Sequence, residues 1–242
     1  MPNYGPRALG RLPSKIDPRT LRLARYLRPE LPVPPAACHW ETIVPTWGVA
    51  GNDRYGNCVI ATAAHAILTW SANAYDDLRP ITDNAVIELS RQMGALRGYN
   101  ILDRLKYWAK TGMWSNTLYA YAAFEPSDES MLMVAINTFG LADIGINMPR
   151  AWMDADVWDA GHGFAYRPGS WGGHSVPLVG YDEQHVYAVT WGQVQAITYA
   201  AIHQYCDEAY ACINPRWIND QGQTPSGFDL TQLREDLAAV RQ

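Results

Sequence analysis

A cysteine directly follows a loop rich in turn-forming residues and begins an apolar, alanine-rich run. The loop spans residues 51–57, and Cys58 opens a run that continues to Trp70. Because this run is apolar on nearly all sides, it predicts a buried central helix over residues 58–70. A helix N-terminus supplies positive potential, which stabilises a thiolate. The position of Cys58 therefore indicates a nucleophilic cysteine, although an isolated cysteine of this kind is more often a core residue.

The second side chain that could do chemistry is a histidine far along the chain. A nucleophilic thiol is activated by an adjacent base, and imidazole commonly serves. His174 follows Gly172-Gly173 and begins a predicted strand over residues 174–181. Glycine before the histidine would let a substrate backbone approach closely. We expect a thiol–imidazole pair, the alternative for His174 being a hydrogen-bonded strand histidine.

Three short segments carry a resemblance to the papain-like cysteine peptidases. Residues 52–58, Asn-Asp-Arg-Tyr-Gly-Asn-Cys, resemble the family segment with a glutamine six residues and a glycine two residues before the nucleophile. Residues 174–181 resemble the family's His-Ala-Val-x-x-Val-Gly-Tyr strand, and residues 190–192 its Asn-Ser-Trp-Gly segment. The order of the segments and the separation of 116 residues (174 − 58) between cysteine and histidine also agree.

The resemblance implies catalytic roles for individual residues. Cys58 would be the nucleophile, and His174 would act as base and then acid. Asn52 matches the oxyanion-hole glutamine but is one methylene shorter, and the backbone N–H of Cys58 would be the other donor. The family's imidazole-orienting asparagine corresponds to Thr190 or Val189, depending on the alignment. Only the threonine hydroxyl could hold an imidazole.

The resemblance further implies a substrate-binding region around the pair. It would include Gly56, Asn57, Gly173 and Trp191, with Trp191 covering the histidine from solvent. No metal site and no cofactor are expected. The chain also departs from the family, because Val59 replaces the usual tryptophan after the nucleophile.

The pattern of elements predicts an α+β protein with the papain-like two-lobed fold: an N-terminal helical lobe with a central helix, and a C-terminal antiparallel β lobe. Residues 1–37 are expected to form an extension that wraps the surface, and residues 38–242 a single catalytic domain. A short helix is predicted from Asp17-Pro18 to Pro29, and further helices at 82–93 (capped by Thr82), 101–111, 128–139 (capped by Ser127), 199–205 and 230–240. Further strands are predicted at 141–147, 186–191, 194–198 and 209–213.

Composition and charge restrict the class of protein. The chain has 242 residues, of which 48% are hydrophobic and 18% charged, as in folded globular proteins. The net charge of −5 argues against nucleic-acid binding. Asp207-Glu208 is expected to be a solvated turn. The basic residues near the N-terminus predict a solvated arm; they are Arg7, Arg11, Lys15, Arg19, Arg22, Arg25 and Arg28.

The sequence also indicates the cellular compartment in which the protein is expected. No run approaches the ~20 apolar residues of a membrane helix, and no secretory signal is visible. The four cysteines form neither a disulfide framework nor a zinc pattern, which is typical of a reducing compartment. A cytoplasmic location and no membrane partner are therefore expected. The sequence is silent on oligomeric state.

Taken together, the residues and the resemblance predict a cysteine-dependent hydrolase of peptide or amide bonds that acts through an acyl-enzyme on a peptide or protein. Two alternatives stay open. One is a weak or inactive papain-fold binding or structural protein of a phage or bacterium. The other is a related acyl-transfer enzyme, such as an amidase, a transglutaminase-like enzyme or a cell-wall peptidase.

Overall fold

The computed structural model describes residues 7–25, 33–74, 78–218 and 224–226. Within them the strands form one nine-stranded sheet in the order β1-β3-β9-β4-β6-β7-β8-β5, with β2 paired to β6 beside this path. The strands are β1 (Leu21–Arg22), β2 (Cys38–His39), β3 (Ala120–Phe124), β4 (Ala142–Met148), β5 (Val157–Trp158), β6 (Gly172–Tyr181), β7 (His185–Thr190), β8 (Gln193–Thr198) and β9 (Cys206–Ile213). From β3 to β8 along this path, neighbouring strands pair antiparallel, whereas β5 pairs with β8 in parallel.

The helices follow the predicted order along the chain. They are α1 (Cys58–Ala74), α2 (Asp83–Gln92), α3 (Ile101–Lys110), α4 (Glu129–Phe139) and α5 (Tyr199–Tyr205), with 3-10 turns η1 (Leu23–Arg25), η2 (Arg150–Trp152), η3 (Phe164–Tyr166) and η4 (Pro215–Trp217). Thr82 caps α2 as predicted, by accepting a hydrogen bond from Ala85 N. The predicted cap of α4 was wrong by one residue: Asp128, not Ser127, accepts from Met131 N. Asp128 lies at the position from which a side-chain oxygen reaches the free N–H groups of the first turn.

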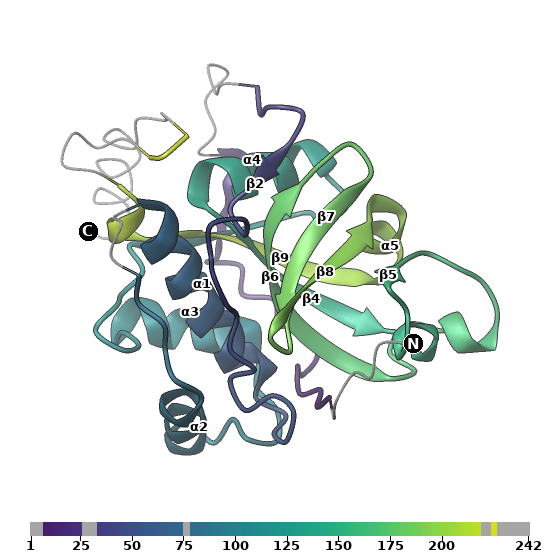
Figure 1. Ribbon diagram of the computed structural model, residues 1–242, viewed down its shortest axis with the longest axis horizontal. Coiled ribbons are helices and arrows are strands. Elements are labelled where there is room, and N and C mark those ends of the chain that lie inside the picture. The colour runs from purple at the N-terminus through teal and green to yellow at the C-terminus, as the bar shows by residue number, and fades with distance from the viewer. Residues whose placement is uncertain (1–6, 26–32, 75–77, 219–223, 227–242) are drawn as a thin grey trace.

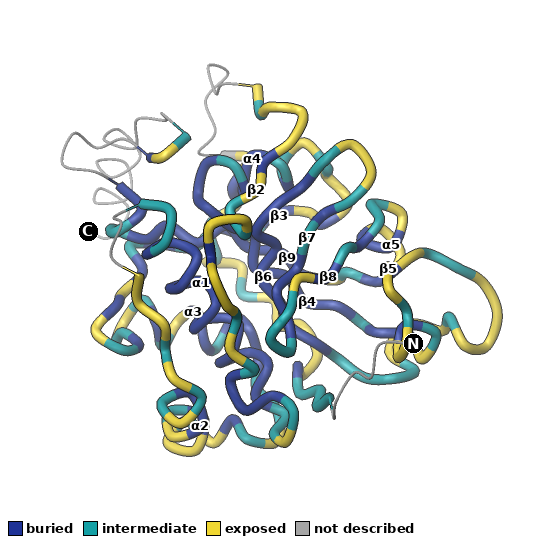
Figure 2. The backbone as a smooth tube through the Cα atoms, in the orientation of Figure 1, coloured by how far each residue is buried: buried dark blue, intermediate teal, exposed yellow. Residues whose placement is uncertain are grey.

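The predicted division into a helical lobe and a β lobe is confirmed. Figure 1 shows α1, α2 and α3 on one side of the molecule and strands β4 to β9 on the other. One buried cluster surrounds α1 and includes Trp70 and Trp108, whose ring centroids are 5.7 Å apart. A second lies within the sheet and includes Ile144 and Leu178. Figure 2 shows that α1 and the central strands are buried almost throughout, so the first turn of α1 lies inside the molecule.

Two predictions for single elements were wrong or incomplete. The helix expected between Asp17-Pro18 and Pro29 is not an α-helix in its described part, which contains β1 followed by the turn η1, and β1 pairs in parallel with β3. Strand β3 itself was not predicted, because three of its five residues are alanine, which has weak strand preference. The helix predicted at 230–240 lies outside the described residues.

A buried ion pair joins the two lobes. Arg104 on α3 donates to the Asp143 carboxylate on β4, and both side chains are essentially inaccessible to solvent. Burial raises the pKa of Asp143, and the neighbouring guanidinium opposes that rise. Among the described residues, no helix is both long and apolar enough to cross a membrane.

Candidate active site

Cys58 is the first residue of α1, where the helix packs against strand β6. Thr62, one turn further along α1, donates a hydrogen bond of 2.9 Å to the carbonyl oxygen of Ser175 on β6. The backbone amide of Ser175 also interacts with the Cys58 thiol. The thiol therefore lies beside the residue that directly follows His174. Cys58 is only 1% exposed.

His174 lies near the start of β6, held by two residues from the end of β7 and the turn after it. Its Nε2 is 2.7 Å from the hydroxyl oxygen of Thr190. Its ring stacks on Trp191 with centroids 4.4 Å apart and planes inclined by 12°. The other ring nitrogen, Nδ1, is buried and has no hydrogen-bond partner in the described part of the chain. One face and one edge of the imidazole are thus fixed, and a second edge is left for another group.

Residues 7–12, which we call the strap, cross between the two lobes over this pair (purple in Figure 1). On the β side, the backbone N–H groups of Gly10 and Arg11 both donate to the carbonyl of Gly173, at 3.2 and 3.0 Å. On the helical side three bonds hold the strap: Ala8 N to Asn52 O, Tyr99 N to Gly10 O and Leu12 N to Tyr99 O, each 2.9 Å.

Glycines allow the strap to lie against its neighbours. A Cβ atom added to Gly10 would lie 1.8 Å from the carbonyl oxygen of Gly56. A Cβ added to Gly173 would lie 2.3 Å from the carbonyl oxygen of Arg11. We expected glycine at 173 to admit a substrate backbone, and the backbone found there is the chain's own. The strap leaves no room for a second peptide in this arrangement.

The strap is also anchored by one of its side chains, that of Arg11. Arg11 Nη1 lies 2.8 Å from both Glu208 Oε1 and Asp207 Oδ1, and Nη2 donates to Asn147 Oδ1 at 2.8 Å. The Arg11 side chain is 1% exposed and that of Glu208 5%. The predictions of a solvated basic arm and of a solvated turn at 207–208 were therefore wrong for Arg11 and for Glu208, which lies within β9. Arg11 and Glu208 can both be buried as charged groups because each is the ion-pair partner of the other.

Burial and the strap set the charge state of the candidate pair. Burial raises the pKa of the Cys58 thiol, and the amides of Ser175 and Gly10 oppose this rise only in part. Burial lowers the pKa of His174 to about 3, with smaller contributions in the same direction from Arg11 and Arg7. In this arrangement the cysteine is a neutral thiol and the histidine a neutral imidazole. The positive potential at the start of α1 does not outweigh desolvation.

The loop before Cys58 is held by side-chain amides. Asn52 Nδ2 donates to Tyr55 O at 2.9 Å and lies 3.4 Å from Asn57 Oδ1. Asn57 Nδ2 donates to Ala50 O at 3.0 Å and lies 3.3 Å from the Ser90 hydroxyl. Both amides thus shape the loop here. Asn52 stays a predicted oxyanion donor that would have to turn away from Tyr55 to act.

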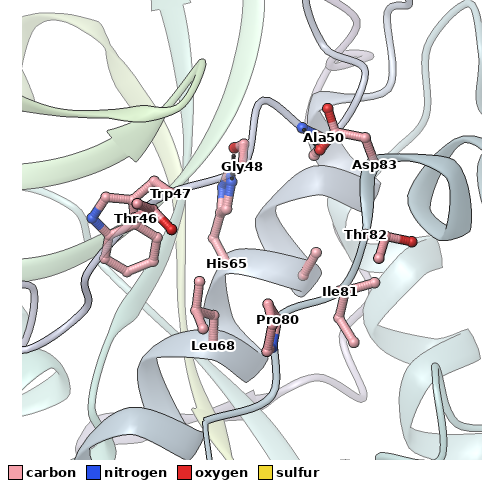
Figure 3. A pocket seen from close by; sticks show the side chains of 11 residues that line it. Thr46, Trp47, Gly48, Ala50, His65, Leu68, Pro80, Ile81, Thr82 and Asp83 are labelled. Atoms are coloured by element: carbon pink, nitrogen blue, oxygen red, sulfur yellow. Dashed lines mark hydrogen bonds between the residues drawn. The ribbon is translucent and has the colours of Figure 1, made fainter.

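A separate hollow of about 230 Å³ lies between residues 46–50, α1 and residues 80–83, and neither Cys58 nor His174 lines it. Figure 3 shows His65 of α1 pointing towards Gly48, with Trp47 and Asp83 nearby. One His65 nitrogen is 2.8 Å from the Gly48 carbonyl, and Trp47 packs edge-on against the ring. This agrees with the interpretation of His65 as a satisfied buried residue. Among the described residues, no cluster of three or more His, Cys, Asp or Glu could hold a metal ion.

The sequence does not single out Asn147 and Gly145, which with Asp207 and Glu208 form the pocket around Arg11. No local pattern marks them, because Arg11 and Glu208 are 197 residues apart in the chain. The sequence indicates such a contact only through charge: residues 207–208 are both acidic, and several basic residues lie near the N-terminus.

Comparison with known proteins places this arrangement among solved structures. No family model matches the sequence, and a search of curated proteins gives no match. The chain superposes on xylellain, a cysteine protease from Xylella fastidiosa, with a TM-score of 0.65 at 15% identity, covering 88% of this chain and 98% of that one. Procathepsin B S9 from Trypanosoma congolense gives 0.60 at 11% identity over 86% of each chain. Procathepsin L2 from Tenebrio molitor gives 0.59 at 14% identity, over 86% and 78%. The chain therefore has the α+β, two-lobed fold of the papain-like cysteine proteases.

Proposed function

We propose that the protein is a cysteine-dependent hydrolase of peptide or amide bonds, with Cys58 as nucleophile and His174 as base and acid. One observation carries the proposal. The His174 ring is held at Nε2 by Thr190 and stacked on Trp191, while its buried Nδ1 has no partner among the described residues. That ring lies on the strand that packs against the helix start bearing Cys58. An imidazole oriented by one neighbour, with its other nitrogen available, suits transfer of a proton from a thiol.

The chemistry follows the usual course of acyl transfer. His174 takes the thiol proton as the Cys58 sulfur forms a bond to the substrate carbonyl carbon. The C–N bond then breaks, and His174 gives the proton to the leaving amine. Water attacks the thioester carbonyl and gives a proton to His174. The C–S bond breaks, a carboxylic acid leaves, and the sulfur recovers its proton.

The oxyanion of each tetrahedral intermediate would lie at the start of α1. N–H groups in the first turn of a helix have no partner within the helix, so the Cys58 amide suits this role. Asn52 would supply a second donor after releasing Tyr55. Gly56, Asn57, Gly173 and Trp191 would surround the substrate, and Thr190 would keep the imidazole in its productive orientation.

The strap makes the described arrangement a resting form under this proposal. It covers the thiol, fills the space between Gly56 and Gly173, and accompanies a neutral imidazole. Hydrolysis would therefore require the strap to leave. The N-terminal extension predicted over residues 1–37 would then act as a cover for the site.

A second candidate is a papain-fold binding or structural protein without catalysis. The burial of Cys58 and the engagement of the Asn52 amide within its own loop favour it. The two candidates differ in what happens once the strap is displaced. An enzyme gains a reactive thiol that depends on His174, whereas a binding protein does not.

The test uses the full chain with Gly10→Ala, a change that displaces the strap without touching a candidate catalytic residue. Iodoacetamide labelling, resolved by site with mass spectrometry, compares Cys58 with Cys38, Cys206 and Cys212. We expect Cys58 to react fastest, because displacing the strap uncovers this thiol beside His174, whereas burial still raises the pKa of the other three thiols. A peptide library then reports hydrolysis.

The control proteins are Gly10→Ala combined with Cys58→Ala, and Gly10→Ala combined with His174→Ala. Loss of hydrolysis in the first, and slow labelling of Cys58 in the second, support the proposal. Hydrolysis that persists without Cys58, or labelling of Cys58 no faster than that of the other thiols, rules the proposal out. Labelling of Cys58 that does not depend on His174, with no cleavage of any peptide, favours the binding protein.

A further inference from the structure

The pocket that holds Arg11 is built from two neighbouring strands of the β lobe. Asn147 and Gly145 come from β4, and Asp207 and Glu208 from β9. Glu208 is itself held in place, since Tyr210 donates a hydrogen bond of 3.1 Å to its second carboxylate oxygen. Its orientation therefore does not depend on Arg11 alone.

The space for the arginine stem comes from an irregularity in the sheet. The pairing of β4 with β9 shifts register between Gly145 and Ile146, as in a β-bulge. A Cβ atom on Gly145 would lie 2.8 Å from Arg11 Cδ and 2.7 Å from Glu208 Cγ. Any larger residue at 145 would narrow the pocket. The bulge and the glycine together leave room for a long side chain.

The backbone contacts of the strap on either side of Arg11 do not depend on its sequence. Gly173 O accepts from the N–H of Arg11, and Tyr99 bonds Gly10 O and Leu12 N on either side of it. Any extended peptide presents the same N–H and C=O groups. A peptide that replaced the strap would satisfy Gly173 and Tyr99 in the same way and would direct one side chain into the pocket.

An empty pocket would leave two neighbouring carboxylates without a cation. Of these, Glu208 is nearly inaccessible to water, and an unpaired buried charge is strongly unfavourable. We propose that this pocket is a specificity site that selects an arginine side chain in the peptide that the enzyme cleaves. This inference rests on the proposed function and names the substrate class of the same site.

The geometry favours arginine over lysine. Glu208 and Asp207 face Nη1, while Asn147 faces Nη2, so three acceptors are spread around a planar fork. A lysine ammonium is a single point charge and cannot meet acceptors placed at both arms of the fork. Arginine should therefore be preferred to lysine, and both to a neutral residue.

The experiment uses the full chain with Gly10→Ala and Arg11→Ala, so that the strap is displaced and its own arginine cannot compete. Fluorogenic peptides share one sequence, that of residues 7–13, and vary only at the position of Arg11, with arginine, lysine, citrulline or norleucine. Citrulline keeps the shape of arginine without its charge. Loss of charged hydrogen bonds predicts a kcat/KM roughly tenfold to a hundredfold lower for citrulline than for arginine.

Variants of the pocket sharpen the test. Glu208→Gln should remove most of the preference for arginine, and Asp207→Asn less of it, because Asp207 is 33% exposed. Gly145→Ala should weaken arginine peptides while leaving every charge in place. Glu129→Gln is the matched control: its carboxylate pairs with His203 on the surface, and the preference should not change.

Binding separates this inference from the proposed function. With Cys58→Ala added, calorimetry measures binding of the arginine and citrulline peptides without hydrolysis. Preferential binding of the arginine peptide, lost with Glu208→Gln, supports the pocket even if no hydrolysis is found. Equal kcat/KM for arginine and citrulline in an active protein, or equal binding in the Cys58→Ala protein, overturns the inference and leaves the proposed hydrolase standing on its own test.

Discussion

Replacing Gly10 by alanine should open the site, because the strap has no space for a methyl group. The added Cβ would lie 1.8 Å from Gly56 O, 2.4 Å from its carbonyl carbon and 2.6 Å from its Cα. All three are backbone atoms, which cannot rotate away as the end of a side chain can. Restoring an ordinary contact of 3.4 Å requires a displacement of about 1.6 Å (3.4 − 1.8). The strap must therefore move as a whole.

The size of the effect follows from what holds the strap. Two hydrogen bonds involve the Gly10 backbone: its N–H donates to the Gly173 carbonyl at 3.2 Å, and its carbonyl accepts from the Tyr99 N–H at 2.9 Å. A shift of that size breaks both bonds. Each contributes about 1 kcal/mol, and overpacking adds about 1–3 kcal/mol. We expect the closed form to lose about 3–5 kcal/mol relative to the open form, which is roughly a hundredfold to a few thousandfold in their ratio.

The assay is the rate of iodoacetamide labelling at Cys58, which should rise by up to that factor. Ser14→Ala, at an exposed residue just beyond the strap, is the control and should label like the unaltered protein. The melting temperature guards against general unfolding, which would expose all four cysteines together. An unchanged labelling rate at Cys58 in folded Gly10→Ala would show that the strap does not limit access to the thiol.

Three further outcomes are expected. Thr190→Val in the Gly10→Ala protein should lower kcat by at least tenfold with little change in KM, and Thr190→Ser should restore it, because only the hydroxyl holds the imidazole; steady-state kinetics measures both. Closing the strap lowers the pKa of His174, so below its usual pKa the open form binds more protons than the closed form. Acidification from pH 7 towards pH 4 should therefore favour opening by up to about tenfold per pH unit. The readout is the protection factor of the amides in residues 7–12, that is, the hydrogen-exchange rate corrected for the intrinsic rate at each pH, and protection that rises in acid would contradict this sign. Arg104→Met should reduce the free energy of unfolding by about 3–5 kcal/mol by leaving Asp143 buried without its partner, whereas adding Asp143→Leu should recover most of the loss in denaturant unfolding.

The sequence predicted the elements with strong short-range patterns. The apolar run after Cys58 predicted α1 from its first residue but ended four residues short at residue 70, and the strand predicted at 174–181 ends where β6 ends but begins two residues late. Those two elements pack against each other, and the amide of Ser175, the residue after His174, interacts with the Cys58 thiol. Thr190 could be named because it occupies the end of a predicted strand next to Trp191, and the structure shows its hydroxyl 2.7 Å from His174.

The strap could not be predicted in the same way. Residues 7–12 read Arg-Ala-Leu-Gly-Arg-Leu, which has neither the alternation of a strand nor the period of a helix. Their structure comes from contacts with Asn52, Tyr99 and Gly173, and a short-range pattern contains no information about such distant partners. The same holds for Arg11, whose charge suggested a solvated arm. A partner 197 residues away makes it one of the most buried charges in the chain.

The strap links access to the site with its charge state. Arg11 and Arg7 both lower the pKa of His174, and the strap's presence keeps water from the ring and from the thiol. Removing the strap would therefore uncover Cys58, rehydrate His174 and withdraw two cations from the imidazole in one step. Uncovering Cys58 and rehydrating His174 favour a thiolate beside an imidazolium over two neutral groups, whereas withdrawing the cations favours the imidazolium and disfavours the thiolate. An arginine-bearing substrate would then return one guanidinium to the pocket, where its charge would favour the thiolate and withdraw the proton from the imidazole. A single pocket would thus hold the guanidinium of the strap in the covered form and that of the substrate in the complex.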